Sequence, residues 1–417
     1  MRYHNITKDD MLNGDGLRVV LWVSGCVHCC KECHNPITWD PNGGLEFDES
    51  AKQEIFDELE KSYVSGITFS GGDPLHINNV YEVTALAKEI KEKYPTKTIW
   101  LYTGSTWEQI QTMKLMKYVD DINMEYGGEG TKLYSTAGTK FKKLCLQNKL
   151  NLLDASVRHL GTDINYVVLE NLYNAMKDHV DFYFDTPVQK VEILEDGYRI
   201  ICEKGSYECK KCIVSVGRSG SKWMETVCKD LRIPTKSNRV DLGVRVELPA
   251  VIFSHLTDEL YESKIVYRTE KFEDNVRTFC MNPNGIVVNE NTNGIITVNG
   301  HSYEGDEKKT DNTNFALLVS KHFSEPFKDS NGYGESIARL SNMLGGGVIV
   351  QRFGDLVRGR RSTVKRVEEG LVRPTLTATP GDLSLVLPKR ILDGIIEMIY
   401  ALDKVAPGTA NDDTLLY

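Results

Sequence analysis

Cys26-Val-His-Cys-Cys-Lys-Glu-Cys33 comes directly after a strongly β-forming segment at residues 17–24. Taking Cys26, Cys30 and Cys33 gives the spacing C-x3-C-x2-C, which leaves Cys29 as a neighbour outside the set. Three thiolates on one short loop can hold three irons of a 4Fe–4S cube. Because the fourth iron then has no protein ligand, the spacing predicts a metal centre with one position open to a small molecule.

Two other interpretations of these cysteines stay open. Zinc also suits closely spaced cysteines, and a structural zinc site would take Cys29 or His28 as its fourth ligand. The other alternative is a group of buried or disulfide-bonded cysteines. The chain starts without the apolar core of a signal peptide and contains ten cysteines, so we expect a reducing cytoplasm and no disulfides.

Segments of strand and helix character alternate three times after the start of the chain. This alternation predicts a parallel sheet with right-handed crossovers, and ligands of such sheets bind beyond the carboxyl ends of the strands. The expected strands are residues 17–24, 66–70 and 98–102, and the expected helices are residues 50–62, 80–93 and 107–118.

Each expected strand ends in a motif that can line a site. The cysteine loop follows the first strand, Gly71-Gly72-Asp73-Pro74 follows the second, and Tyr102-Thr-Gly104 ends the third. Glycine lets a backbone come close to a ligand, although Gly-Gly-Asp-Pro is also ordinary turn chemistry. Asn13-Gly-Asp-Gly16 with Arg18 either closes the mouth of the site or forms a surface turn.

Together these motifs resemble the radical S-adenosylmethionine (SAM) enzymes, and more narrowly the activating proteins of the anaerobic (class III) ribonucleotide reductase. The resemblance covers residues 1–120 and includes Tyr3-His4-Asn5, Ser70–Leu75 and Trp100–Gly104. It implies a partial radical-SAM (βα)n barrel with a parallel sheet, and a 4Fe–4S cluster on Cys26, Cys30 and Cys33.

The same resemblance implies a chemistry and a set of contacts. The open iron would bind SAM, and an electron from the reduced cluster would break the S–C5′ bond to give a 5′-deoxyadenosyl radical. The SAM contacts would be Glu32, Cys33, His34, Gly71, Gly72 and Asp73, and no side chain is given a catalytic role. A packed or solvent-facing histidine explains His34 equally well.

The implied protein substrate is the anaerobic ribonucleotide reductase, whose radical would form on the α-carbon of a glycine near its C-terminus. A flavodoxin- or ferredoxin-type donor would supply the electron. The tail rich in Gly, Ser, Asn and Gln that is usual in this family is not recognisable after Asp120. No apolar stretch reaches the roughly eighteen residues that a membrane helix needs, and a net charge of −9 argues against a nucleic-acid partner.

From residue 123 onward the sequence resembles a second family, the FAD-dependent dehydrogenases related to glutathione-reductase-like flavoproteins. That family's Gly-x-Gly-x-x-Gly after a strand, which holds the FAD pyrophosphate, is absent here. The resemblance thus implies FAD, whereas the missing fingerprint makes FAD binding doubtful. The segments that carry the resemblance are Val157–Asp163, Ile213–Gly220, Val240–Glu247, Arg277–Pro283, Val298–Ser302 and Gly381–Pro388.

Two further groups have both a functional and a structural interpretation. Cys209 and Cys212 lie at the entry to an expected strand, Ile213–Val216, and lack the second close pair of a zinc ribbon, which favours a structural role. The basic run Arg358–Arg366 could grip a phosphate or an acidic partner, but a solvated face explains it better.

A length of 417 residues with 41% hydrophobic residues allows two or three domains with their own cores. We expect an α/β fold with a radical SAM activase domain at 1–122, a partial FAD-dehydrogenase-like domain at 123–238 and a substrate or cap-like domain at 239–417. The last two form an α+β flavoprotein-like region that lacks its first dinucleotide-binding βαβ unit.

The leading hypothesis is an oxidoreductase, a radical SAM activase that generates a glycyl radical on anaerobic ribonucleoside-triphosphate reductase. The first alternative is an FAD-dependent oxidoreductase whose iron–sulfur unit is accessory. The second is that the C-terminal part only binds or scaffolds.

Overall fold

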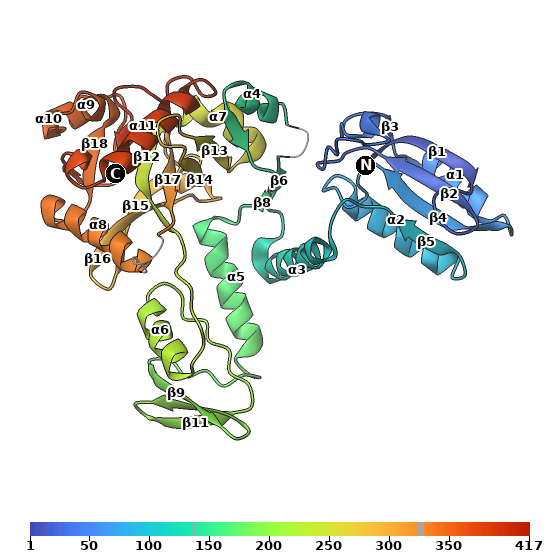
Figure 1. Ribbon diagram of the computed structural model, residues 1–417, viewed down its shortest axis with the longest axis horizontal. Helices are drawn as coiled ribbons and strands as arrows, with labels where there is room; N and C mark the ends of the chain where they lie inside the picture. Colours follow the sequence, from blue (N-terminus) through green and yellow to red (C-terminus); the bar gives the residue numbers. More distant parts are fainter. Residues whose placement is uncertain (137–138, 324–328) are drawn as a thin grey trace. The chain divides into compact units, whose positions relative to one another are not determined.

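The computed structural model describes residues 1–136, 139–323 and 329–417. Two compact units make up the chain, and each is described by itself (Figure 1). The first unit consists of Met1–Glu125, Lys132–Lys142 and Asp154–Arg158. The second consists of Tyr126–Thr131, Lys143–Leu153 and His159–Tyr417.

A five-stranded sheet in the order β3-β1-β2-β4-β5 forms the centre of the first unit. Strands β2, β4 and β5 are parallel, which confirms the predicted arrangement, while β1 pairs antiparallel with β2 and β3. Val23 lies opposite Gly71 at the carboxyl ends of β2 and β4, so the motifs that follow these strands meet at one edge of the sheet. The strands are β1 (Arg2–Asp10), β2 (Leu17–Val23), β3 (Leu45–Glu46), β4 (Val64–Gly71) and β5 (Thr98–Leu101).

Helices α1 and α2 cover this sheet with the apolar faces that their sequence periodicity predicts. The Asp48 side chain caps α1 by accepting a hydrogen bond from the Ala51 N–H. The core contains Val19 and Leu21 of β2, Ile55 of α1, Phe69 of β4 and Ile90 of α2. The helical and turn segments of this unit are η1 (Pro36–Thr38), α1 (Glu49–Leu59), α2 (Val80–Lys93) and α3 (Trp107–Asn123), and a short strand pair is formed by β6 (Leu133–Ser135) and β8 (Ser156–Arg158).

The prediction that Arg18 helps to close the mouth of the site is wrong. Its side chain is fully buried and donates to the Thr68 hydroxyl, to the Ile67 carbonyl and to the Thr98 carbonyl. Arg18 and Thr98 lie at the starts of β2 and β5, at the opposite end of these strands from the cysteine loop. Arg18 therefore ties the three parallel strands together and does not close the mouth of the site.

An eight-stranded sheet in the order β19-β18-β20-β12-β17-β14-β13-β7 forms the centre of the second unit. Figure 1 shows α7 and α11 on one side of this sheet and α8 with the β15–β16 hairpin on the other. Leu242, Val244 and Val246 are buried on β12 together with Leu317 on β17.

The strands of the second unit are β7 (Leu150–Leu152), β9 (Val188–Leu194), β10 (Gly197–Cys202), β11 (Gly205–Cys209), β12 (Val240–Pro249), β13 (Ile265–Arg268), β14 (Asn275–Asn282), β15 (Ile286–Thr292), β16 (Ile295–His301), β17 (Asn312–Lys321), β18 (Ile349–Arg352), β19 (Thr379–Pro380) and β20 (Leu415–Leu416). Its longer helices are α5 (Gly161–Met176), α6 (Ser221–Asp230), α7 (Ala250–Leu260), α8 (Ser330–Gly345) and α11 (Lys389–Asp403). The shorter helical segments are η2 (Met124–Gly128), α4 (Phe141–Gln147), η3 (Asp306–Lys308), α9 (Phe353–Val357), α10 (Val364–Glu368) and η4 (Leu383–Leu385).

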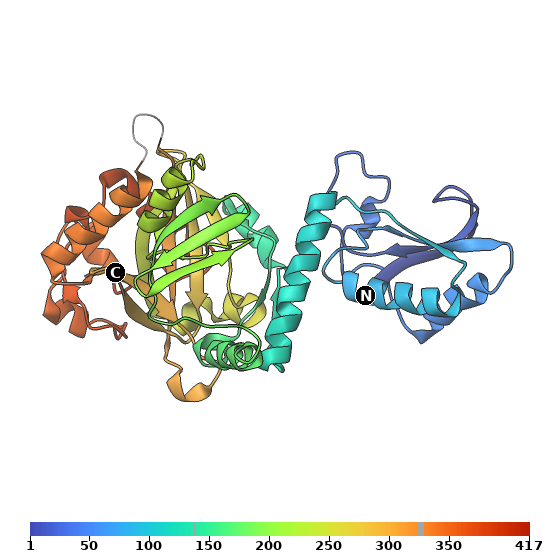
Figure 2. The ribbon, with the colours of Figure 1, turned by 90° about the horizontal axis from the view of Figure 1, so that it is seen from below.

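Strands β9, β10 and β11 form a separate antiparallel sheet, which Figure 2 shows as three light-green strands side by side. The prediction of a strand at Ile213–Val216 is wrong, because this segment has no strand conformation and Ile213 is 93% exposed. An apolar strand of this kind needs neighbours on a parallel sheet. Among the described strands, none pairs with this segment.

Gly346 ends α8 in the left-handed conformation, at φ 66°, as expected for a turn glycine.

Among the described residues, no helix has the length and apolar character needed to cross a membrane.

Candidate iron–sulfur site

The first half of the cysteine loop, which follows β2 directly, is anchored by hydrogen bonds to two other segments of the first unit. The Gly25 N–H donates to the Thr38 carbonyl at 2.7 Å, and the Cys26 N–H donates to the Trp39 carbonyl at 3.1 Å. Asn79, which is fully buried, donates from Nδ2 to the Ser24 carbonyl at 2.8 Å. The position of Cys26 is therefore determined by the segment after the loop and by the start of α2.

Backbone N–H groups face the sulfurs of two predicted ligands. Burial raises the pKa of the Cys26 thiol, and N–H groups of His28 and Cys29 act against this by hydrogen bonding to its sulfur. The Asn35 N–H lies 3.4 Å from the Cys33 sulfur. Hydrogen bonds of this kind stabilise thiolates, and they are found around the sulfurs of iron–sulfur ligands.

The second half of the loop forms a tight turn at the surface. The Cys33 N–H donates to the Cys30 carbonyl at 3.1 Å, which closes a turn between these two predicted ligands. Cys29 is exposed and has φ 45°, in the left-handed region. Cys30 is also exposed, whereas Cys26 and Cys33 are half-buried.

The chemistry of this donor set fits an iron–sulfur cluster. All ten cysteines are free, and three of them with the expected spacing share one anchored loop. Within the described ranges, no three His, Cys, Asp or Glu side chains are gathered in a geometry that would hold a single metal ion.

The Gly-Gly-Asp motif locks the ends of β2 and β4 together. The Gly72 N–H donates to the Val23 carbonyl and the Asp73 N–H donates to the Gly25 carbonyl, both at 2.8 Å. A Cβ atom on Gly72 would lie 2.5 Å from the Gly25 carbonyl oxygen. Only glycine fits at this position, because both sides of the contact are backbone.

Asp73 joins the ends of all three parallel strands. The residue is 3% exposed, and its carboxylate accepts from His28 Nε2 at 2.7 Å and from the Thr103 hydroxyl at 3.0 Å, both on Oδ2. The Leu75 N–H donates to Oδ1 at 2.9 Å. His28 also packs against Gly104, where an added Cβ would lie 2.5 Å from the imidazole. Asp73 thus positions the cysteine loop through His28.

The predicted SAM contacts fall into two groups. Gly71, Gly72 and Asp73 come together with the anchored part of the cysteine loop, whereas Glu32 and His34 are exposed on its outer part. The link from His28 through Asp73 to Thr103 was missed from the sequence. Its only signal is that each of the three residues closely follows the carboxyl end of a parallel strand.

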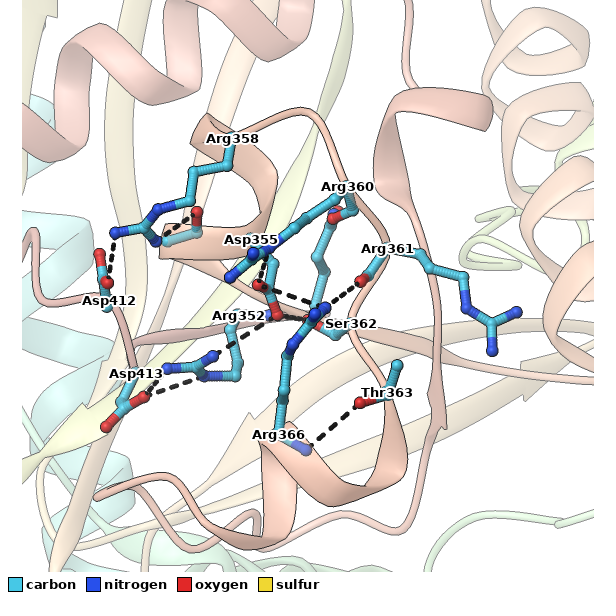
Figure 3. Close-up of polar contacts among 12 residues, drawn as sticks. Arg352, Asp355, Arg358, Arg360, Arg361, Ser362, Thr363, Arg366, Asp412 and Asp413 are labelled. Atoms are coloured by element: carbon cyan, nitrogen blue, oxygen red, sulfur yellow. Dashed lines mark hydrogen bonds and ion pairs between the residues drawn. The ribbon is translucent and has the colours of Figure 1, made fainter.

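The basic run Arg358–Arg366 belongs to an ion-pair network in the second unit. Figure 3 shows Arg352, Arg360 and Arg366 pointing toward Asp355, and Arg361 pointing away. Burial would raise the pKa of Asp355, but hydrogen bonds from Ser362 and Arg360 lower it overall. The Arg358 side chain instead pairs with Asp412 at 2.7 Å. The run is part-exposed, and much of its charge is neutralised within the fold.

Replacing Asp355 by alanine is expected to lower the free energy of unfolding by about 3 kcal/mol, because three guanidinium groups lose the buried carboxylate between them. Replacing Asp412, which is 53% exposed, should cost only about 1 kcal/mol or less. Urea unfolding and hydrogen exchange of peptides from residues 349–370 measure both effects. Equal losses in the two variants would contradict a central role for Asp355.

Two domain families match the chain. The family described as "4Fe-4S single cluster domain" matches residues 12–148, which include the cysteine loop, the Gly-Gly-Asp motif and the end of β5. The family described as "FAD-dependent protein, C-terminal domain-like" matches residues 241–417, in the second unit. The second unit therefore contains a domain similar to the C-terminal domain of FAD-dependent proteins.

Curated relatives match the N-terminal part. The anaerobic ribonucleoside-triphosphate reductase-activating protein of Enterobacteria phage T4 is 43% identical over 122 residues, which are 29% of this chain and 78% of the relative. The protein of that name from Escherichia coli (strain K12) is 38% identical over 131 residues, 31% of this chain and 84% of its own. The Haemophilus influenzae protein of the same name is 36% identical over 124 residues, which are 29% of this chain and 80% of the relative. Through its N-terminal part, the chain belongs to the family of anaerobic ribonucleoside-triphosphate reductase-activating proteins.

Proposed function

We propose that the first unit is a radical SAM activase that generates a glycyl radical on an anaerobic ribonucleoside-triphosphate reductase. The observation that carries this proposal is the meeting of the three-cysteine loop and the Gly-Gly-Asp motif at the carboxyl ends of the parallel strands of the sheet. Ligands of such sheets bind at this edge. The names of the curated relatives supply the protein substrate.

Cys26, Cys30 and Cys33 hold the cluster in this proposal. A 4Fe–4S cluster on three thiolates supplies an open iron and one electron, which is the chemistry that cleaves the S–C5′ bond of SAM. The protein binds and orients SAM and keeps water from the site. Gly71 and Gly72 bring backbone close to the ligand. The contacts on the loop come from Glu32, Cys33 and His34, and Asp73 positions the loop that carries them.

The three parallel strands form part of a radical-SAM barrel in this proposal, within a domain that we place at residues 1–122. Strand β5 is an outer strand of the sheet, and Trp100 and Leu101 are each 37% exposed on it. An outer strand of this kind can pair with an extended segment of a protein substrate. The electron comes from a flavodoxin- or ferredoxin-type donor, and the protein works in the cytoplasm.

One anaerobic preparation of the full chain tests the proposal. The protein is reconstituted with iron and sulfide, reduced with dithionite and mixed with SAM. We expect 5′-deoxyadenosine and methionine in equal amounts, and a glycyl radical signal when the reductase is added. Absence of both products from a protein that has taken up four irons would overturn the proposal.

A second candidate function rests on the FAD-dependent domain match at residues 241–417. In this case the chain is an FAD-dependent oxidoreductase and the iron–sulfur unit is accessory. The same preparation distinguishes the two, since flavin absorbance that co-purifies without SAM cleavage favours the oxidoreductase. SAM cleavage without bound flavin favours the activase.

The Asp73→Ala variant should retain its iron and lose most of its activity. His28 and Thr103 lose their shared acceptor, while the three cysteines stay in place. Loss of a partner that orients ligand-bearing groups typically costs about tenfold or more in activity, so we expect SAM cleavage to fall by about that factor. Iron analysis and a plot of rate against SAM concentration measure this. The Thr103→Val variant, which removes one of the donors, should show a smaller loss. A wild-type rate in Asp73→Ala would show that Asp73 does not position the site.

A further inference from the structure

A buried arginine lies on one face of the large sheet in the second unit. Arg245 is in the middle of β12 and is 2% exposed. Side chains alternate between the two faces of a strand, so Arg245 lies on the face opposite to that of Val244 and Val246. Ala316 of β17 is its cross-strand neighbour.

The guanidinium of Arg245 has only neutral acceptors. Its Nε donates to Asn314 Oδ1 at 2.8 Å, Nη2 donates to the Cys280 carbonyl at 2.6 Å, and Nη1 lies 3.5 Å from Asn299 Oδ1. Burial lowers the pKa of Arg245, and the more distant charges of Glu262 and Glu290 act only weakly in the opposite direction. In the part of the chain that the structure describes, no carboxylate lies within ion-pair distance of this group. A buried charge of this kind requires a counter-charge.

The nearest buried acid on the same face already has its partners. Glu247 is two residues further along β12 and is fully buried. It accepts from the Tyr417 hydroxyl at 2.5 Å, from the Thr375 hydroxyl at 2.6 Å and from Asn312 Nδ2 at 3.0 Å. Both carboxylate oxygens of Glu247 are occupied by these donors and none of them is Arg245, so the two groups do not form an ion pair.

Asn314, beside the guanidinium, has an unpaired polar atom. Its side chain is fully buried, and Nδ2 has no hydrogen-bond partner among the described residues. Arg245 Nε and Asn282 Nδ2 both donate to Oδ1, which fixes the orientation of the amide. A buried N–H group without an acceptor is costly, so this cluster has two groups that require an acceptor, one of them charged.

Gly300 is needed for the guanidinium to reach this position. A Cβ atom there would lie 2.0 Å from Arg245 Nη2 and 2.1 Å from Asn314 Oδ1. Cys280 contributes its carbonyl because it has φ 48°, in the left-handed region, where the register between β14 and β17 shifts. Bulges of this kind redirect groups beside binding sites. The local backbone is therefore shaped around the guanidinium.

Arg245 lines a cavity of about 590 Å³ between the sheet, the β15–β16 hairpin and α8. Its lining combines apolar side chains, among them Phe279, Ile296 and Leu318, with polar and charged ones. The three acids of the lining each pair with a basic side chain other than Arg245: Glu290 with Arg218, Glu335 with Lys222 and Asp241 with Arg277. Cavities of this size that combine apolar walls with a few placed polar groups are typical of small-molecule sites.

We propose that this cavity binds a small organic monocarboxylate, with its carboxylate on Arg245 and its apolar body between the hairpin and α8. A planar guanidinium matches a carboxylate in geometry. A single buried cation matches one negative charge, which favours a monocarboxylate over a phosphate. This site lies in the second unit and does not depend on the proposed activase.

Titration calorimetry of the full chain tests the proposal. The probes are cinnamate, octanoate and indoleacetate, each compared with its neutral amide. We expect at least one acid to bind, about tenfold or more tighter than its amide, which is the ratio that one charge-assisted hydrogen bond supplies. Equal binding of acid and amide, or no binding of any of the acids at millimolar concentration, would overturn the proposal.

Three variants locate the binding. Arg245→Gln should weaken acid binding about tenfold and leave amide binding unchanged. Ala338→Trp, on α8, fills the cavity and should abolish both, which keeps the test decisive if Arg245→Gln does not fold. Arg339→Gln is the matched control, since Arg339 lines the same cavity but is exposed. A loss in Arg339→Gln as large as that in Arg245→Gln would place the carboxylate elsewhere.

Discussion

Serine in place of Cys26, Cys30 or Cys33 is expected to abolish iron–sulfur cluster binding and SAM cleavage. Serine is a poor ligand for these clusters, and the loop offers no spare thiolate in the right place. We expect the iron content to fall from four per chain to a small fraction, and the cleavage rate to fall about a thousandfold or more, since the loss removes the electron source itself. Iron and sulfide analysis and the yield of 5′-deoxyadenosine measure both.

The matched control is Cys29→Ser, in the same loop. Cys29 is exposed, and C-x3-C-x2-C leaves it out, so this variant should keep its iron and most of its activity. A four-coordinate zinc site that used Cys29 would give the opposite result. If Cys29→Ser lost its metal as completely as Cys30→Ser, the three-cysteine assignment would be wrong.

Alanine in place of Gly72 is expected to have the next largest effect. The new Cβ would lie 2.5 Å from the Gly25 carbonyl oxygen, and two backbone hydrogen bonds hold the segments together there. The ends of β2 and β4 would have to separate, which moves Cys26. Overpacking of this kind costs about 1–3 kcal/mol of stability. Misplacement of reacting groups by about 1 Å can cost about a hundredfold in rate.

Thermal unfolding and the rate of SAM cleavage measure the Gly72→Ala variant. Gly305→Ala is a suitable control, because the nearest atom to its added Cβ lies at an ordinary distance of 3.7 Å. We expect the control to retain wild-type activity and stability. A fully active Gly72→Ala protein would show that the close contact between these strand ends is not required.

The sequence was sufficient to predict the parallel part of the first sheet. Strands β2, β4 and β5 are short β-forming segments separated by amphipathic helices, and each carries its own local signal. Strand β1 was missed because most of its residues are polar and it has no buried face of its own. Its stability comes from pairing with β2 across the sheet, for example of Ile6 with Leu21, and this has no local signature.

Arg18 and Asp73 show why the side-chain contacts within the first unit could not be predicted. Ile67 and Thr98, whose carbonyl groups accept hydrogen bonds from the Arg18 guanidinium, are 49 and 80 positions away. Asp73 lies 45 positions from His28 and 30 from Thr103. Residue type and spacing placed these side chains near strand ends, but their bonds depend on strand register.

The second unit was harder to interpret. Arg245 lies in Val240–Glu247, one of the segments that resemble the FAD-dependent dehydrogenases. Nothing in the sequence shows that this arginine is buried without an acid partner. Gly300, Cys280 and Asn314, which surround it, come from three other parts of the chain. Their convergence follows from the packing of β14, β16 and β17 against β12, which no local pattern encodes.

The central claim is that three cysteines leave one iron of the cluster open to SAM. The most direct measurement is electron paramagnetic resonance of the full chain, anaerobically reconstituted and reduced, recorded before and after addition of SAM. We predict a reduced 4Fe–4S signal whose g-values shift on addition of SAM, in wild type and in Cys29→Ser alike. A cluster signal that SAM leaves unchanged, or a purified protein that holds zinc with four protein ligands, would contradict the claim.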